Sequence, residues 1–209
     1  IHNNNIGGQA AVKTPLGSTL YSGTEASVNL DVTGQAYAKL TFTQMLASSM
    51  TVRSGSRLTS TSTFAPTVGG EVNVGGEWVA TKTVQLVAAA LSVPAGGKLS
   101  CTGNNAAVDV AVSGAGTPCD IEGTVEAPSG VVQLTSSGGT VSLTSSARVT
   151  AQSRVTAVAS NSAVNVGGSS IMSCTAASCD VQVSAETGVT VTGKVYGKSE
   201  SGDLADATQ

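Results

Sequence analysis

The carboxylates of this sequence are the residues whose type and spacing come nearest to enzymatic chemistry. Hydrolysis of a glycosidic bond needs two of them, one as general acid and one as nucleophile or base. The available pairs are Glu122 with Glu126 and Glu71 with Glu77, but on β-strands such glutamates are more typical of solvated turn or edge positions. A Ser-His-Asp triad also lacks a suitable histidine, because the single one, His2, lies almost at the start of the chain. We therefore expect a protein that is not an enzyme, with no catalytic residue and no cofactor.

The four cysteines are the next residues considered, because cysteines can form disulfides or bind a metal ion. Their even number in a weakly charged chain favours disulfides and an extracellular or cell-surface location. The preferred pairing is Cys101 with Cys119 and Cys174 with Cys179, each closing a hairpin. Four free buried thiols in a cytosolic protein are the alternative. A zinc site would need all four cysteines at a spacing that suits it poorly, so no metal site is expected.

The composition of the 209 residues excludes several other classes of protein. Ten Lys and Arg against thirteen Asp and Glu give a net charge of −3 with no basic cluster, which argues against nucleic-acid binding. The sequence contains no run of about 18 apolar residues, so no membrane-spanning helix is expected. A hydrophobic fraction of 40% is enough to build a core, which argues against a disordered chain.

Short runs of alternating apolar and polar residues, separated by Gly-Gly pairs, predict an all-β protein. They also form an internal repeat with an offset near 70 residues. The clearest matches are Asp109-Val-Ala-Val-Ser113 with Asp180-Val-Gln-Val-Ser184, and Ile121-Glu-Gly-Thr-Val125 with Val191-Thr-Gly-Lys-Val195. Further matches pair Gly69–Val74 with Gly138–Leu143 and Thr83–Ala88 with Arg154–Ala159. A fainter copy lies upstream, where Val28-Asn-Leu30 resembles Val72-Asn-Val74.

The repeat raises two architectures, an antiparallel β-sandwich built of long ribbons and a β-solenoid. Residues 147–159 alternate almost without interruption, and a single strand of that length would run about 43 Å. Residues 78–88 behave in the same way. We therefore predict the antiparallel sandwich with an internal duplication, with the β-solenoid as the alternative.

The expected organisation follows from the repeat and from the two ends. It consists of an extended N-terminal segment (1–13), a β region holding the degenerate copy (14–68), a first β repeat (69–127), a second β repeat (138–197) and a polar, acidic tail (198–209).

Only 11% of the residues are charged, so much of the exterior must be Ser, Thr, Ala, Val and Gly. Such a surface is buried most simply against copies of the same chain. The N-terminal residues supply a means, because Ile6, Gly8, Ala10 and Val12 share one face of an extended segment. A segment of this kind can complete the sheet of a neighbouring subunit.

The pattern Ile6-Gly-Gly-Gln-Ala-Ala-Val12 and the Ser/Thr/Val/Ala/Gly-rich β body resemble pilin-like subunits of donor-strand-assembled extracellular fibres. The resemblance implies that Ile6, Ala10 and Val12 insert into a neighbouring subunit while Gly8 permits close approach. We expect a secreted structural subunit that self-assembles into a helical homopolymer resembling a fimbria. The alternative is a surface adhesin or receptor-binding module for glycans, with contacts from loops at residues 53–57 and 59–67.

Overall fold

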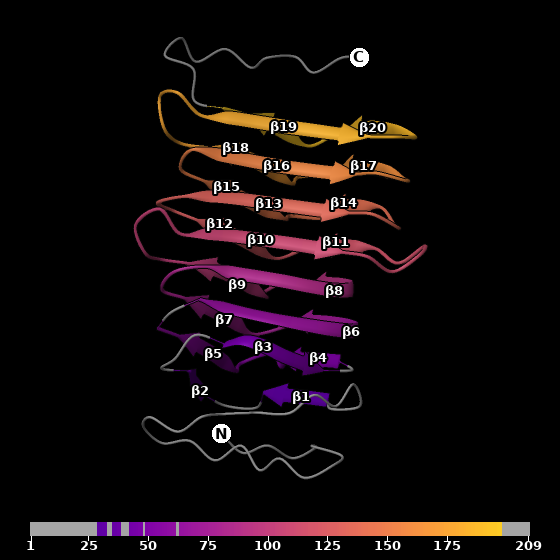
Figure 1. Ribbon diagram of the computed structural model, residues 1–209. Coiled ribbons are helices and arrows are strands. Elements are labelled where there is room, and N and C mark those ends of the chain that lie inside the picture. The colour runs from indigo at the N-terminus through magenta and orange to yellow at the C-terminus, as the bar shows by residue number, and fades with distance from the viewer. Residues whose placement is uncertain (1–28, 33–34, 39–41, 48, 62, 198–209) are drawn as a thin grey trace.

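The computed structural model describes residues 29–32, 35–38, 42–47, 49–61 and 63–197, and in them it forms 21 strands. All of the strand pairs described are parallel. The chain winds around a common axis, and each circuit, or rung, lies on the one before it (Figure 1). The architecture is therefore a β-solenoid. No helix in this part of the chain is long and apolar enough to cross a membrane.

Each full rung contributes a strand segment to three columns that run the length of the stack. The first column contains β3 (Phe42–Ala47), the first halves of β6 (Phe64–Val74) and β8 (Val84–Val93), β10 (Ala107–Val112), β13 (Val131–Ser136), β16 (Arg154–Ala159) and β19 (Asp180–Ala185). The second contains β1 (Asn29–Val32), β4 (Ser49–Val52), the second halves of β6 and β8, β11 (Cys119–Ile121), β14 (Val141–Leu143), β17 (Ala163–Val166) and β20 (Gly188–Val191). These two columns form one sheet of 13 strands.

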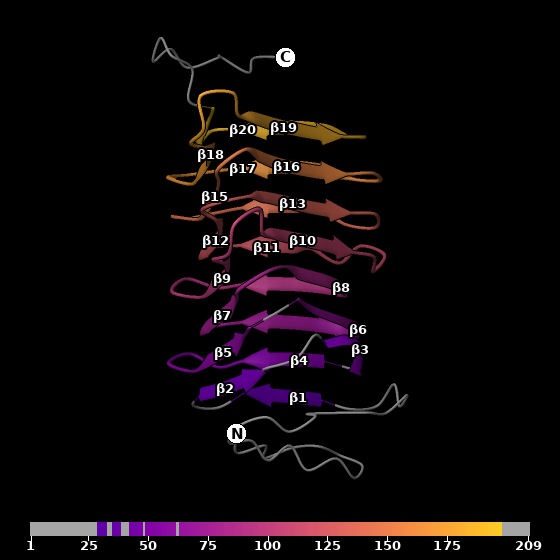
Figure 2. The same cartoon turned by 60° about the vertical axis from the view of Figure 1, so that its left-hand side comes forward.

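The third column is a separate sheet of eight strands. It contains β2 (Gln35–Ala38), β5 (Arg57–Ser60), β7 (Glu77–Ala80), β9 (Lys98–Cys101), β12 (Thr124–Ala127), β15 (Arg148–Ala151), β18 (Ile171–Cys174) and β21 (Lys194–Tyr196). Figure 2 shows β9, β12, β15 and β18 stacked along one side, and β10, β13, β16 and β19 along another.

The core is a set of apolar ladders enclosed by the three columns. One ladder in the first column runs through Phe64, Val84, Val108, Val132 and Val155, which succeed one another in strict register and are buried. Alternation along each strand places one residue in this interior and the next on the outer surface. Stacking in register then puts apolar side chains from successive rungs against one another, which stabilises the stack through burial.

An aromatic contact joins the first and third columns across this interior. The rings of Phe64 and Trp78 pack edge to face with their centroids 5.0 Å apart, and neither side chain is exposed by more than 2%. Such a pair adds about 1 kcal/mol beyond the burial of its area.

The predicted antiparallel sandwich is wrong, and the alternative solenoid is the fold. The segment taken as one long strand consists of β15 and β16, which belong to different sheets and are separated by a corner at Gln152 and Ser153. Both corner amides donate to the carbonyl of Gly130 in the rung below, at 3.1 and 3.0 Å. The alternation continues in phase across this corner, because Ala151 and Val155 both face the interior. In the same way, residues 78–88 divide between β7 and β8.

The stack of rungs explains the length of the sequence repeat. Asp109 on β10 and Asp180 on β19 are equivalent residues of the repeat, and they are separated by three rungs of the first column. One repeat therefore corresponds to three rungs. The two predicted repeats, 69–127 and 138–197, are consecutive parts of a single stack.

Candidate assembly surface at the last rung

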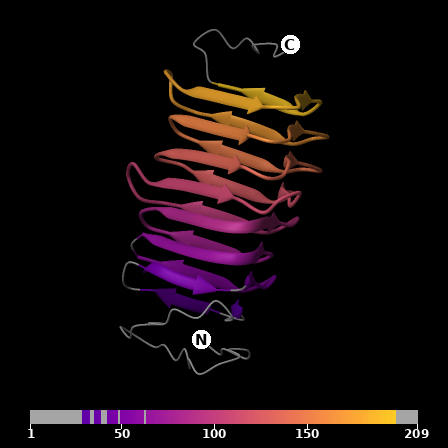
Figure 3. The ribbon, with the colours of Figure 1, turned by 45° about the vertical axis from the view of Figure 1, so that its right-hand side comes forward.

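The last described rung consists of β19, β20 and β21, and it differs from the inner rungs in having one neighbour (Figure 3). β19 pairs with β16, β20 with β17 and β21 with β18. Within the described part of the chain, the opposite edge of each strand has no partner strand. A strand edge of this kind presents a row of backbone donors and acceptors to which another strand can pair.

The interior positions of the last rung are only partly covered. Val189 on β20 is 38% exposed, whereas Val164, its register partner on β17, is fully buried. Val183 and Val195 are likewise partly exposed and pack against the core from one side. The rung therefore presents the apolar cross-section of the solenoid at its end.

The sequence of the last rung is that of an inner rung. It is the repeat partner of the rung β10–β11–β12, through the match of Asp180–Ser184 with Asp109–Ser113 and of Val191–Val195 with Ile121–Val125. In that inner rung, Val110, Ile121 and Val125 are completely buried between two neighbours. The side chains at the end of the stack are thus of the kind that this protein elsewhere covers with a further rung.

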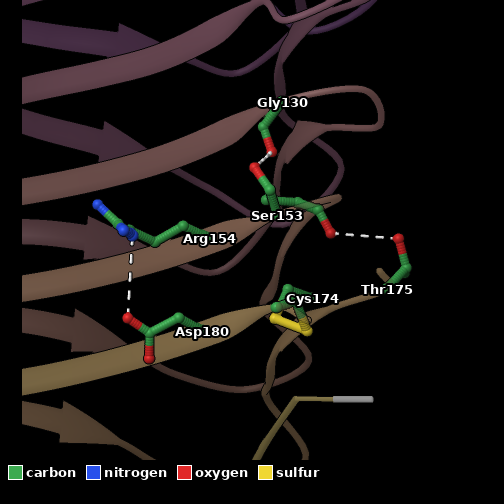
Figure 4. The surroundings of a disulfide bond; sticks show 8 residues. Gly130, Ser153, Arg154, Cys174, Thr175 and Asp180 are labelled. Atoms are coloured by element: carbon green, nitrogen blue, oxygen red, sulfur yellow. Dashed lines mark hydrogen bonds and ion pairs between the residues drawn. A yellow bond between two sulfur atoms is a disulfide. The ribbon is translucent and has the colours of Figure 1, made fainter. Parts of the chain in front are cut away.

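A disulfide braces the loop that enters the last rung (Figure 4). Cys174 ends β18 and is bonded to Cys179, with the two Cα atoms 5.8 Å apart. The loop between them is also hydrogen-bonded to the rung below, since the amide of Ala176 donates to the carbonyl of Gln152 at 2.8 Å. A Cβ built on Gly197, which follows β21, would lie 3.4 Å from the Cys179 Sγ. The covalent link therefore touches both the beginning and the end of the last rung.

An ion pair supports the same corner. The Arg154 side chain on β16 lies 3.8 Å from the Asp180 carboxylate on β19, in the next rung along the chain (Figure 4). Both side chains are about half exposed, so the pair contributes at most a few tenths of a kcal/mol and chiefly favours the observed register.

The predicted pairing of Cys101 with Cys119 is not formed, whereas the pairing of Cys174 with Cys179 is. Cys101 lies on β9 in the third column and Cys119 on β11 in the second, and both are free and buried. The segment between them is not a hairpin, because it runs through two corners and β10. Burial is the main cause that raises the pKa of the Cys101 thiol to about 11 and that of Cys119 to about 12. Both thiols are therefore protonated core residues at neutral pH.

The carboxylates weighed for catalysis do not converge on one site. Glu126 lies on β12 and is held 2.7 Å from the Lys98 amine, and Glu77 on β7 is held 3.2 Å from the Arg57 guanidinium. Glu122 lies at the corner between β11 and β12, and Glu71 lies in the second half of β6, in the other sheet.

Two aspartates on the outer surface have a perturbed pKa. Partial burial raises the pKa of Asp109 on β10. Burial also raises that of Asp120 on β11, although a hydrogen bond from Ser142 opposes the shift and the nearby Glu122 carboxylate adds to it. The described residues contain no group of three or more His, Cys, Asp or Glu that could hold a metal ion.

The residues predicted to form the donor strand, Ile6, Gly8, Ala10 and Val12, lie outside the described residues. Of the ranges predicted for adhesin contacts, 53–57 forms the corner between β4 and β5, whereas 59–67 is divided between β5 and β6. Comparisons with models of protein families, with curated proteins and with solved structures gave no match.

Sequence reasoning did not identify the last rung as a candidate assembly surface. The signal was present, because a repeat unit near the end of the chain matches one in its middle. It could be interpreted only once the repeat was known to stack along an axis.

Proposed function

We propose that this protein is a structural subunit, without enzymatic activity, that assembles end to end into an extracellular filament. The observation that carries the proposal is the last described rung. It has an inner-rung sequence, one neighbouring rung among the described residues, and Val189 exposed by 38%. A further rung from another copy would complete its backbone pairing and bury its apolar cross-section.

The forces that would join two subunits are those that already join the rungs. Parallel pairing across three strands supplies backbone hydrogen bonds, and removal of apolar surface from water contributes about 25 cal/mol per Å². Because a stack presents two different ends, contact through them repeats without closing, which is the geometry of a filament. The Cys174–Cys179 disulfide supports an extracellular location, since such bonds persist in oxidising compartments.

The N-terminal segment is part of this proposal as a candidate donor strand. Residues 1–28 lead into β1 at Asn29, and β1 belongs to the rung at the opposite end of the stack from β19. Insertion of Ile6, Gly8, Ala10 and Val12 into a neighbour remains the prediction of the resemblance to pilin-like subunits. In a solenoid, the edge with which such a segment would pair is that of β19 in the last rung.

The test compares the assembly of the full chain and two variants by sedimentation velocity and negative-stain electron microscopy over a range of concentrations. Wild type should form fibres as its concentration rises. Val189→Asp places a charge on the exposed apolar end and should remain monomeric. Val87→Asp is the matched control, because Val87 is also a valine exposed by 38% but lies on the outer surface of the inner strand β8, away from the end of the stack, and this variant should assemble as wild type does.

A wild-type protein that stays monomeric at every concentration would overturn the proposal. If those monomers bound glycans or cells, the surface-adhesin alternative would replace it. Circular dichroism of each variant at low concentration separates loss of assembly from loss of folding.

A further inference from the structure

We infer that the surface covering the last rung is the first rung, β1–β2, of the next copy, so that the filament is polar with every subunit pointing the same way. This inference rests on the proposed function and names its partner. It distinguishes a head-to-tail contact from a tail-to-tail contact between two last rungs, which would close as a dimer.

The order of the columns argues against the tail-to-tail contact. A twofold axis perpendicular to the stack reverses the sense in which the first, second and third columns follow one another around it. At most one column can then meet its own counterpart, and the other two must meet each other; if β19 meets β19, for instance, β20 meets β21. The strands would also pair antiparallel, whereas every strand pair described in this protein is parallel.

A head-to-tail contact keeps both the order and the direction of the strands. In the second column, Val32 of β1 pairs with Val52 and Val52 with Val74; one residue beyond the Asn73–Ser92 pair, the same ladder continues through Val93, Ile121, Leu143, Val166 and Val191. Extending that ladder by one rung places Val32 of the next copy beside Val191. The adjacent ladder on the same strands places Asp31 beside Thr190.

The third column extends in the same manner. The register places Gln35, Ala36 and Tyr37 of β2 at the start of the ladders that end at Lys194, Val195 and Tyr196 of β21. The ladder from Tyr37 to Tyr196 has a tyrosine only at its two ends. Stacking would bring these two tyrosines to adjacent rungs, about 4.8 Å apart along the stack. Tyr196 is 37% exposed at the end of the solenoid and is available for such a contact.

The first column of the described residues begins at β3, one rung after β1, so the described contact is carried by the second and third columns.

The test uses the native tyrosines, of which the chain has three. A mixture of ordinary and ¹⁵N-labelled full chain is assembled, cross-linked by brief photo-oxidation to dityrosine, digested and analysed by mass spectrometry. The expected product joins a Tyr37 peptide of one label to a Tyr196 peptide of the other. Tyr37→Phe and Tyr196→Phe should each abolish it, and Tyr21→Phe, the matched control, should leave it unchanged.

A second pair of variants makes the test independent of tyrosine chemistry. Asp31→Cys and Thr190→Cys, prepared as separate proteins, should form an intermolecular disulfide when mixed, because adjacent rungs lie within the Cα separation that a disulfide spans. Neither protein should form it alone. A Tyr196–Tyr196 product, or a disulfide between two Thr190→Cys chains, would overturn the head-to-tail arrangement and leave self-assembly standing. Absence of any assembly in the unmodified protein would overturn the proposed function itself.

Discussion

The half-covered valine of the last rung permits a quantitative prediction from a matched pair. Val164 and Val189 are register partners on β17 and β20, and they differ in that Val164 is fully buried and Val189 is 38% exposed. Replacing a buried valine by alanine removes about 1.6 kcal/mol of transfer free energy and leaves a cavity, so Val164→Ala should destabilise the monomer by about 2 to 3 kcal/mol. In Val189→Ala, only the buried part of the side chain loses its transfer free energy, and no closed cavity is left. This variant should therefore lower the free energy of unfolding by about 1 kcal/mol.

The exposed part of the Val189 side chain should contribute to the free energy of association between subunits. If another copy covers the last rung, the exposed fraction of Val189 becomes buried there, and its loss corresponds to about 0.6 kcal/mol, or roughly a threefold weaker association. Val164→Ala should leave the association constant unchanged. Both valines lie at equivalent strand positions, so differences in β propensity largely cancel between the two variants.

The assay is urea unfolding followed by circular dichroism at a concentration below the onset of assembly, with light scattering used to measure association above it. Equal losses of unfolding free energy for the two variants would refute the reasoning. That result would mean that Val189 is already covered within the monomer, and the last rung would then be closed.

Three further predictions concern the stability of the stack. Gly139→Ala should prevent folding or reduce the unfolding free energy by several kcal/mol in the same urea assay, because a Cβ there would lie 1.7 Å from the carbonyl oxygen of Thr117; an unchanged midpoint would contradict the rung spacing at that corner. Replacing Cys174 and Cys179 together by alanine should cost about 2 kcal/mol in the chain-entropy model and should increase amide hydrogen exchange first in β19–β21; uniform exchange over the whole chain would show that the bond does not act on the last rung. Burial raises the pKa of the Cys119 thiol to about 12, above its ordinary value of 9.0. The protonated thiol therefore contributes fully to stability below pH 9, and this contribution is lost as the pH rises toward 12. The loss of unfolding free energy at alkaline pH, measured by urea titration at each pH, should be smaller in Cys119→Ala than in wild type.

The all-β class, the internal repeat and the Cys174–Cys179 bond could be predicted from the sequence because each rests on local information. Alternation along the chain reports which residues face a core, and two cysteines five residues apart can meet without knowledge of the rest of the fold. The choice between sandwich and solenoid depends instead on where strands end. At Gln152 and Ser153 the corner preserves the alternation, so the periodicity of residues 147–159 is the same for one long strand as for two short ones.

The free cysteines were mispredicted for a related reason. In an antiparallel arrangement the segment between Cys101 and Cys119 would return on itself, and the two thiols could meet. In the solenoid the chain goes forward through β10 to the next column, so each thiol fills the interior on its own strand. The assumption of a sandwich also explains why the last rung was not predicted as a surface. In a sandwich of paired ribbons, no terminal element is equivalent to an inner one.

Electron cryomicroscopy of filaments grown from the full chain is the measurement that bears most directly on the account. The described residues of each subunit contribute eight strands to the third column. At about 4.8 Å per rung, an uninterrupted head-to-tail stack predicts an axial subunit repeat of roughly 38 Å, with all subunits in the same orientation. Discrete monomers at high concentration, or fibres in which the subunits alternate in direction, would contradict the claim that the last rung is completed by the first rung of another copy.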